Sequence, residues 1–416
     1  MVQKSAKVSL KTPHLVFLIT SDLDSPAGVG RYFPLSKNLV RQGYSVSIAA
    51  LHPNFKALDK HAFEKEGVKV AYISQMHVKK QDSKTEYFNF IELLWVSIKA
   101  TWKFLVFLIS KKADVVVIGK PHPMNSLAGL IGGYLSGSKI ILDCDDYEAA
   151  SNFFSSSLQQ KVVAFFEDTV PRFVHHITTN TQFNQQRMVD LGLPIEKIDY
   201  LPNGIDFERF SNIDLSNIKT LNSRLNLDGK IVVSYIGSLN LANHPVDLLI
   251  QAFKIILDQK QNAILLIVGG GKDLEKLQDL AEELGLEKHT IFEGRVPPED
   301  VPSYYVITDV SVDPVEDTLA AKGRCPLKLF ESWAMRTPFV TADIGDRRAL
   351  AGEPPAFLLS SPGDYLDLAE KILKILHEPT LTNSLVTQGL AKVNQFSWQN
   401  LAEEFSKILE KIIIKP

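Results

Sequence analysis

Residues 14–51, HLVFLITSDLDSPAGVGRYFPLSKNLVRQGYSVSIAAL, decide the fold of the first half of the chain. His14–Thr20 and Ser45–Leu51 are short apolar runs, and a helical pattern over Gly28–Gln42 separates them. Strands that are apolar on both faces and alternate with helices predict parallel βαβ units with both sheet faces covered. The alternation continues through further apolar runs at Val68–Ile73, Asp114–Ile118, Lys139–Leu142 and His176–Thr179.

A second series of apolar runs begins at Lys230–Ile236 (KIVVSYI), after a segment over Pro202–Arg224 that is expected to be a linker. Further strands are expected at Ile264–Val268, Thr290–Phe292, Val310–Val312 and Phe339–Thr341, and helices at Pro245–Leu257, Lys272–Leu284, Lys328–Met335 and Pro362–His377. We therefore predict an α/β protein of two Rossmann-like, doubly wound domains. A cleft is expected between the carboxyl ends of their strands.

Composition excludes several classes of protein. The chain has 416 residues, with 45 Lys and Arg against 48 Asp and Glu, so its net charge of −3 gives no sign of a nucleic-acid partner. The two cysteines, Cys144 and Cys325, fit a reducing compartment and cannot form a Cys-rich zinc site. The first apolar run is short and no small-residue cleavage site follows it, so we expect a cytoplasmic protein.

Residues 91–109 (IELLWVSIKATWKFLVFLI) are unusually apolar but include Glu92, Lys99 and Lys103. A spanning helix needs about 20 nearly uncharged residues, so we do not predict a membrane span. Two interpretations stay open. The segment is a helix that covers the sheet, or its apolar face makes peripheral contact with the inner face of a membrane, aided by nearby lysines.

Three segments carry a family resemblance: Asp199–Phe210 (DYLPNGIDFERF), Phe292–Tyr305 (FEGRVPPEDVPSYY) and Pro326–Val340 (PLKLFESWAMRTPFV). Together they resemble the retaining family-4 glycosyltransferases of GT-B architecture. The resemblance implies transfer of a sugar from a nucleotide-diphosphate sugar to an acceptor hydroxyl, with retention of anomeric configuration. It also implies an acceptor-binding domain over 1–203, a donor-binding domain over 204–395 and a terminal helix over 396–416 that crosses back to the first domain.

The sequence departs from the usual family pattern at three positions. Most members carry two glutamates in the donor domain, and here the second is Glu331 while the first position is Gly323. Ser238 and His244 stand where most members have an arginine and a lysine. The chain thus resembles the subgroup with a Lys-x-x-Glu core, which implies Lys328 on the donor phosphate and Glu331 on the ribose hydroxyls.

A replacement for the missing cations is available close to this core. Arg324 and Lys328 are four residues apart at the start of an expected helix, where cations and backbone amides suit a departing diphosphate. The alternative is a surface salt bridge between Lys328 and Glu331, three residues apart on one helix face.

The resemblance also implies roles for other residues. Gly28 is expected at the donor phosphate or sugar, and the backbone of Arg295 and Val296 at the nucleobase. Asp145 or Asp146 is expected to face the transferred sugar, with a metal site or helix capping as alternatives for this acidic run. His122 is a candidate on the acceptor side, with a packed loop histidine as its alternative. The remaining donor-binding candidates are Gly237, Ser238 and Leu329.

No cofactor and no catalytic metal are expected, since the nucleotide sugar is a substrate. The expected acceptor is a glycan, a lipid-linked molecule or a small molecule, in the synthesis of glycans, cell-surface polysaccharides or glycolipids. Two alternatives stay open: an inactive relative that binds nucleotide sugars, and a sugar-nucleotide epimerase of the same architecture. A nicotinamide oxidoreductase is disfavoured, because neither half has a complete dinucleotide fingerprint.

Overall fold

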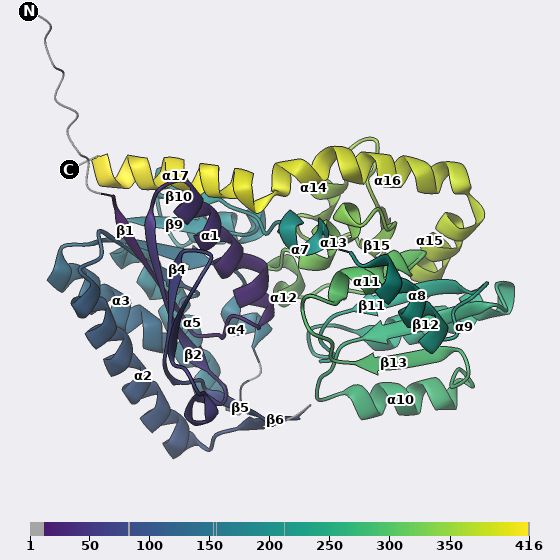
Figure 1. The fold of residues 1–416 in the computed structure, drawn as a ribbon, viewed down its shortest axis with the longest axis horizontal. Coiled ribbons are helices and arrows are strands. Elements are labelled where there is room, and N and C mark those ends of the chain that lie inside the picture. The colour runs from purple at the N-terminus through teal and green to yellow at the C-terminus, as the bar shows by residue number, and fades with distance from the viewer. Residues whose placement is uncertain (1–11, 82–83, 153, 155, 212, 415–416) are drawn as a thin grey trace, which may run out of the picture.

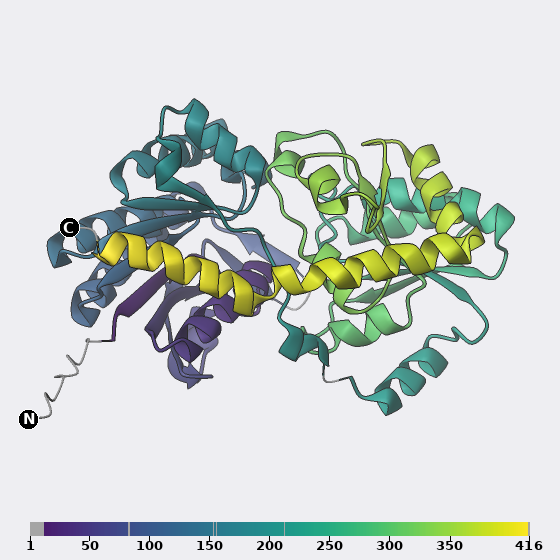
Figure 2. The same ribbon diagram turned by 90° about the horizontal axis from the view of Figure 1, so that it is seen from above.

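The computed structural model describes residues 12–81, 84–152, 154, 156–211 and 213–414. The lysine-containing start at 1–11, on which part of the expected localisation rests, lies outside these residues. Two α/β units lie side by side, and two consecutive helices, α16 (Pro379–Val393) and α17 (Trp398–Ile414), run along both of them (Figure 2).

The first unit is built on a sheet in the order β10-β9-β8-β7-β1-β2-β4-β3. All neighbours are parallel except β3, which pairs antiparallel with β4. The order reverses between β1 and β7, and such a switch point is where open α/β sheets bind ligands. The strands are β1 (His14–Ile19), β2 (Ser45–His52), β3 (Ala62–Lys65), β4 (Val68–Gln75), β7 (Val115–Gly119), β8 (Lys139–Cys144), β9 (His176–Thr179) and β10 (Ile198–Tyr200).

Two apolar cores cover the two faces of this sheet, as its doubly apolar strands require. One core contains Phe17 and Ile48 with side chains of α17, including Trp398 and Phe405, and α1 (Phe33–Arg41) packs there. The other contains Val116 and residues of four helices. These helices are α2 (Phe90–Lys111), α3 (Pro123–Ser136), α5 (Ser157–Thr169) and α6 (Gln182–Asp190).

The second unit has a fully parallel sheet in the order β13-β12-β11-β14-β15-β16, which reverses between β11 and β14. Its strands are β11 (Ile231–Ile236), β12 (Ala263–Val268), β13 (Thr290–Gly294), β14 (Val310–Asp313), β15 (Phe339–Ala342) and β16 (Leu358–Ser360). Its main helices are α9 (Val246–Gln259), α10 (Leu274–Glu283), α13 (Leu327–Ala334), α15 (Tyr365–His377) and α16. Figure 1 shows both sheets with helices on their two faces. The predicted pair of doubly wound α/β domains is confirmed.

The chain crosses itself where the two units join. The Ile205 backbone amide donates to the Phe396 carbonyl at 2.9 Å, and the Trp398 amide donates to the Ile205 carbonyl at 3.0 Å. A Cβ atom at Gly204 would lie 2.1 Å from the Phe396 carbonyl oxygen, so only glycine allows this approach. The Pro-Asn-Gly-Ile-Asp segment therefore ties the start of α17 to the connection between the units.

One local expectation, the linker, is wrong, and the expected helix after β1 is confirmed with a different first turn. The expected linker contains two helices, α7 (Phe207–Ser211) and α8 (Leu215–Arg224), because Phe210 and Leu221 are buried in a core of the second unit. The expected helix over 28–42 begins with a π-helical turn at Gly28–Tyr32 before α1. A short hairpin of β5 (Val78–Gln81) and β6 (Lys84–Tyr87) also has no counterpart among the expected strands.

Candidate functional site

The carboxyl ends of the two sheets meet through direct contacts between the units. The Asn184 side chain donates to the Gly323 carbonyl at 3.1 Å, and the Asn243 side chain donates to the Ser151 carbonyl at 2.5 Å. Two short helices, α4 (Glu148–Ser151) of the first unit and α12 (Leu319–Lys322) of the second, pack against each other (Figure 1). The two switch points therefore face one common region, where a ligand of one unit can reach the other.

Lys328 lies at the switch point of the second unit. It is the second residue of α13, and its Nζ donates to Oδ1 of Asp313, the last residue of β14, at 2.8 Å. The same Nζ lies 4.1 Å from the centroid of the Tyr235 ring. Burial alone would lower the pKa of Lys328, but Asp313 raises it above its usual value. Lys328 is therefore a buried, charged ammonium.

A second buried cation shares the same carboxylate. Arg347, at the start of α14 (Arg347–Ala351), donates from Nη2 to Oδ2 of Asp313 at 3.3 Å. Burial opposes ionisation of Asp313, yet Lys328 and Arg347 lower its pKa. The one ionised carboxylate is thus shared by two cations, which leaves a surplus of positive charge.

Arg324 adds a third positive charge to this cluster. Its Nη1 donates to the Asn243 carbonyl at 2.7 Å and lies 3.5 Å from Nδ1 of His244. Within the described part of the chain, no carboxylate lies within ion-pair distance of Arg324. Burial, followed by the charges of Arg324 and Lys328, lowers the pKa of His244 well below its usual value, so His244 is neutral at pH 7. The cation at this position is therefore Arg324.

Glu331 lies one turn further along α13. It accepts from Nη2 of Arg209 at 2.5 Å and from the Tyr305 hydroxyl at 2.9 Å. The alternative of a Lys328–Glu331 salt bridge is not observed, because each residue pairs with another partner. Glu331, Gly30, Leu327 and Trp398 line a cavity of only about 10 Å³ between the units. This volume suits one water molecule, so a ribose could reach Glu331 here only after the units move apart.

The position of the absent first glutamate is filled by the first unit. A Cβ atom at Gly323 would lie 2.8 Å from Cβ of Tyr147 and 3.2 Å from its backbone nitrogen. The Tyr147 ring also packs against Arg187, whose guanidinium carbon lies 4.2 Å from the ring centroid. A glutamate at 323 would therefore require Tyr147, at the start of α4, to move.

The first unit contributes a buried ion pair between Arg31 and Asp143, which lies near the carboxyl end of β8. Arg31 donates from Nε to Oδ2 of Asp143 at 2.8 Å and from Nη2 to Oδ1 at 2.6 Å, a buried bidentate pair. Thr178 donates to the same carboxylate at 2.6 Å. Both oxygens of Asp143 are therefore engaged, which disfavours its use as a metal ligand. Among the described residues, no group of three or more His, Cys, Asp or Glu side chains is arranged to hold a metal ion.

The sugar-side candidates gather around Lys120, which follows β7. Its Nζ lies 2.6 Å from Oδ2 of Asp146, 2.9 Å from Oε1 of Glu148 and 3.6 Å from Oδ2 of Asp145. His122 lies 3.2 Å from the other oxygen of Glu148, Nε2 to Oε2. The structure thus brings Asp145, Asp146 and His122 together. We use the name acidic cluster for a group of seven residues: Lys120, His122, Asp145, Asp146 and Glu148, together with Arg31 and Asp143.

The electrostatics of the acidic cluster are opposite to those of the second unit. Four carboxylates, at 143, 145, 146 and 148, surround the two permanent cations Arg31 and Lys120. Burial raises the pKa of Asp145 to about 6; Lys120 opposes the rise and Asp146 adds to it. A ligand that bridges the units would therefore meet cations at one end and carboxylates at the other.

The other predicted donor-binding residues differ in which of their atoms a ligand could contact. A Cβ atom at Gly28 would lie 2.2 Å from the Asp22 carbonyl, so a tight turn suffices to explain this glycine. Gly237 faces Lys328, whose Nζ would lie 3.2 Å from an added Cβ, and the Ser238 carbonyl accepts from the Tyr235 hydroxyl at 2.8 Å. The Leu329 side chain is fully buried in the core, which leaves only its backbone for a ligand.

The nucleobase candidates follow β13. The Arg295 side chain packs over Gly270, whose added Cβ would lie 2.9 Å from Arg295 Cγ, and Val296 packs against the core of the second unit. The backbone of Arg295 and Val296 therefore lies at the carboxyl edge of the second sheet, where Gly237 also lies.

Five charged residues of the site were not among the sequence-based candidates: Arg31, Lys120, Glu148, Asp313 and Arg347. Lys120 directly follows β7 and Asp313 ends β14, and these positions at strand ends could have identified both residues from the sequence. The other three residues belong to the site only through contacts between segments that are distant in the sequence.

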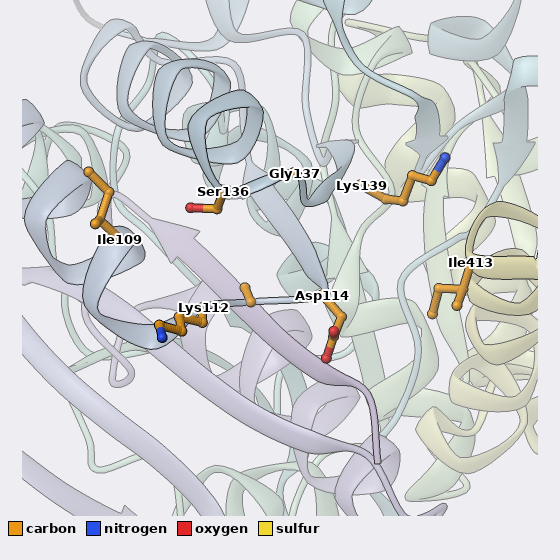
Figure 3. A pocket seen from close by; sticks show the side chains of 8 residues that line it. Ile109, Lys112, Asp114, Ser136, Gly137, Lys139 and Ile413 are labelled. Carbon is orange, nitrogen blue, oxygen red and sulfur yellow. The ribbon is translucent and has the colours of Figure 1, made fainter. Parts of the chain in front are cut away.

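A larger cavity lies elsewhere and contains none of these residues. It measures about 600 Å³ and is lined in part by Ile109, Asp114, Lys139 and Ile413 (Figure 3). Asp114 and Lys139 lie at the amino ends of β7 and β8, on the edge of the first sheet opposite to Lys120. This cavity is therefore separate from the facing switch points.

Two domain models match the chain. Residues 27–204 match the glycosyl transferase 4-like domain, and residues 218–392 match the glycosyl transferases group 1 domain. Mannosylfructose-phosphate synthase of Agrobacterium fabrum is 27% identical over 237 residues, which are 55% of this chain and 50% of that protein. A GDP-mannose-dependent alpha-(1-6)-phosphatidylinositol monomannoside mannosyltransferase of Mycobacterium tuberculosis is 30% identical over 242 residues, 56% of this chain and 61% of that protein. The matches span about half the length of these curated relatives.

Solved structures share the whole architecture at low identity. Sucrose-phosphate synthase from Thermosynechococcus elongatus superposes with a TM-score of 0.76 and 16% identity, covering 98% of this chain and 100% of that one. Anabaena Alr3699/HepE in complex with UDP and glucose gives a TM-score of 0.71 and 17% identity, covering 95% and 99%. These likenesses show the fold alone.

Proposed function

Because its two halves match glycosyltransferase domain models and its two units have the GT-B arrangement, the chain belongs to the GT-B glycosyltransferases, and we propose that it is a retaining, family-4-type enzyme. In this proposal it moves a sugar from a nucleoside-diphosphate sugar to an acceptor hydroxyl. Its donor site has the Lys-x-x-Glu core of Lys328 and Glu331.

The observation that carries the proposal is the surplus of positive charge at the second switch point. Lys328 and Arg347 share a single carboxylate, Asp313, and Arg324 is a third cation close to both. A diphosphate gains negative charge as it leaves the sugar, and fixed cations in a dry site stabilise that charge strongly. Among the described residues, no carboxylate pairs with the Arg324 guanidinium, so we assign Arg324 and Lys328 to the departing diphosphate.

The acidic cluster suits the other end of the donor. The sugar carbon becomes electron-poor as the bond to phosphate breaks, and carboxylates nearby stabilise that positive charge. Tyr147, next to Asp146, contacts Gly323, next to Arg324, so the two clusters are adjacent across the junction. We assign Asp145 and Asp146 to the sugar, and His122 to the acceptor side.

Retention follows if the acceptor attacks the face from which the diphosphate leaves, with a phosphate oxygen taking its proton. A strong protein base is then unnecessary. Closure of the two units excludes water and limits hydrolysis of the donor, whereas opening gives the ribose access to Glu331. No catalytic metal is required in this scheme.

A thermal-shift panel of UDP-, GDP-, ADP- and TDP-sugars tests the proposal. One donor class is expected to raise the melting temperature, because a ligand at 100 times its Kd stabilises a protein by about 2.7 kcal/mol. Product analysis with that donor then separates the alternatives. Transfer with retention supports the proposal, conversion of the donor alone indicates an epimerase, and binding without turnover on any acceptor indicates an inactive relative. No shift with any donor would contradict it.

The raised pKa of Asp145 predicts a pH dependence. Its pKa is about 6, so the carboxylate becomes protonated as the pH falls through that value, and its stabilising negative charge is lost. We therefore expect kcat/KM to fall about tenfold per pH unit well below 6. Asp145→Asn should have low activity and no such decline, since its side chain does not titrate. A decline of the same shape in D145N would show that another group is responsible.

A further inference from the structure

The outer side of the first unit carries an exposed apolar surface over three neighbouring helices. α2 packs on α3, and α3 packs on α5, all over one face of the sheet (Figure 1). On α2, Ile91 and Trp95 are each 67% exposed and Trp102 is 62% exposed. Ile131 and Leu135 of α3 and Phe165 of α5 are 46%, 72% and 63% exposed. Large side chains gathered on one face mark an interaction site more often than scattered single ones do.

α2 is held in the fold by its opposite side. Its Ala100, Phe104 and Leu108 are buried in the core that covers the sheet. By length and composition α2 could cross a membrane, and only 17% of its most apolar window is buried inside the structure. Crossing a bilayer would uncover the core beneath it. A helix that is packed on one side and apolar on the other lies along an interface rather than through it.

The charges beside this surface are almost all positive. α2 carries exposed Lys99 and Lys103 along the apolar stripe and Lys111 and Lys112 at its end, and α5 carries exposed Lys161. α3 has no charged residue. The acidic residues of the three helices are Glu92, which caps the start of α2, buried Glu167, and Asp168, which pairs with Arg187.

From this combination we propose that the exposed apolar surface of α2, α3 and α5, here called the docking surface, binds an anionic lipid bilayer. Tryptophan and leucine side chains enter the boundary between headgroups and acyl chains, while the lysine stems lie along the apolar surface and their ammonium groups meet lipid phosphates. A basic residue near an anionic membrane strengthens binding, and five of them supply a substantial part of the attraction.

The docking surface borders the acidic cluster. α3 begins directly after His122, and α5 follows α4, whose first residue is Glu148. Both helices therefore start at the edge of the sheet where the acidic cluster lies. Resting on the proposed function, this placement favours a lipid-linked acceptor that reaches the site from the bilayer over a small soluble one.

Flotation of the full chain with lipid vesicles tests the docking surface. The probes are vesicles of phosphatidylcholine with phosphatidylglycerol, and vesicles of phosphatidylcholine alone. We expect binding to the first and at least tenfold weaker binding to the second, because lipid charge supplies much of the attraction. Trp95→Ser with Trp102→Ser, and Lys99→Glu with Lys103→Glu, should each reduce binding at least tenfold.

Matched controls lie on the second unit. Leu366 on α15 is 58% exposed, and Lys288 is exposed in a loop of the same unit. Leu366→Ser and Lys288→Glu should leave flotation unchanged, and circular dichroism should show all variants folded. Light scattering without vesicles should show no change of oligomeric state in W95S/W102S.

Several results would overturn the docking proposal. These are no binding to anionic vesicles, binding that the surface variants leave intact, or a self-association that W95S/W102S abolishes, which would make the surface an interface between copies. Donor-induced thermal shifts are measured without vesicles, so failure of docking and failure of the transferase proposal are separable.

Discussion

Arg324→Ala is expected to lower kcat by about 10²–10³-fold, the usual loss when one preorganised partner of a developing negative charge is removed. Arg324 has a backbone carbonyl and a neutral histidine as neighbours, and no ion-pair partner in the described part of the chain. The fold should therefore lose little, about 1 kcal/mol for one hydrogen bond. Arg324→Lys should restore part of the rate, since it returns the charge without the fork-shaped donor geometry.

A nearby lysine provides the control for this variant. Lys322 is 36% exposed and pairs with Asp317 at the surface, only two residues from Arg324. Lys322→Ala removes a positive charge from the same segment and should leave kcat within about twofold, since a surface ion pair contributes little. Steady-state kinetics with the donor from the thermal-shift panel give both values. Equal losses in both variants would mean that general loop disturbance, not the Arg324 charge, lowers the rate.

Lys328→Met is expected to reduce both stability and activity. It removes one of the two cations on Asp313 and leaves that buried carboxylate with only Arg347, which costs about 3 kcal/mol of unfolding free energy. It also removes the second cation assigned to the diphosphate, so kcat should fall by about 10²-fold or more. Urea unfolding measures the first effect and kinetics the second.

A triple variant separates the structural and catalytic effects of Lys328. In Lys328→Met with Asp313→Asn and Arg347→Met, no charge of this buried group is left without a partner, and part of the lost stability should return. The donor-induced thermal shift and kcat should stay low, because the cation is still missing. Recovery of activity along with stability would show that Lys328 only supports the fold.

The architecture was predictable because its information is local. Each parallel strand is a short apolar run, as in Leu15–Ile19 or Ala263–Val268, and the intervening helices carry an apolar stripe. The segments that escaped prediction are those whose burial is one-sided or absent. α8 is mostly polar and is recognised as a helix only through the packing of Leu221, and strand β3 is mostly exposed.

The candidate site was predictable only in part. The acidic run stands out in the sequence because it lies at the end of a strand, β8, and the Lys-x-x-Glu core stands out because it forms a motif. The roles of both toward a donor stay predictions. The pairings that tune them join distant residues: Arg31 and Asp143 are 112 positions apart, and Arg324 and His244 are 80 apart. Their proximity depends on the tertiary fold, and the contact of Tyr147 with Gly323 also depends on how the units meet.

A crystal structure of the full chain with a bound nucleoside diphosphate tests the central claim most directly. The diphosphate oxygens should lie at about 2.7–2.9 Å from the Arg324 guanidinium and from Nζ of Lys328, the distances of charge-assisted hydrogen bonds. A diphosphate held elsewhere, with both cations still on their present protein partners, would contradict the assignment.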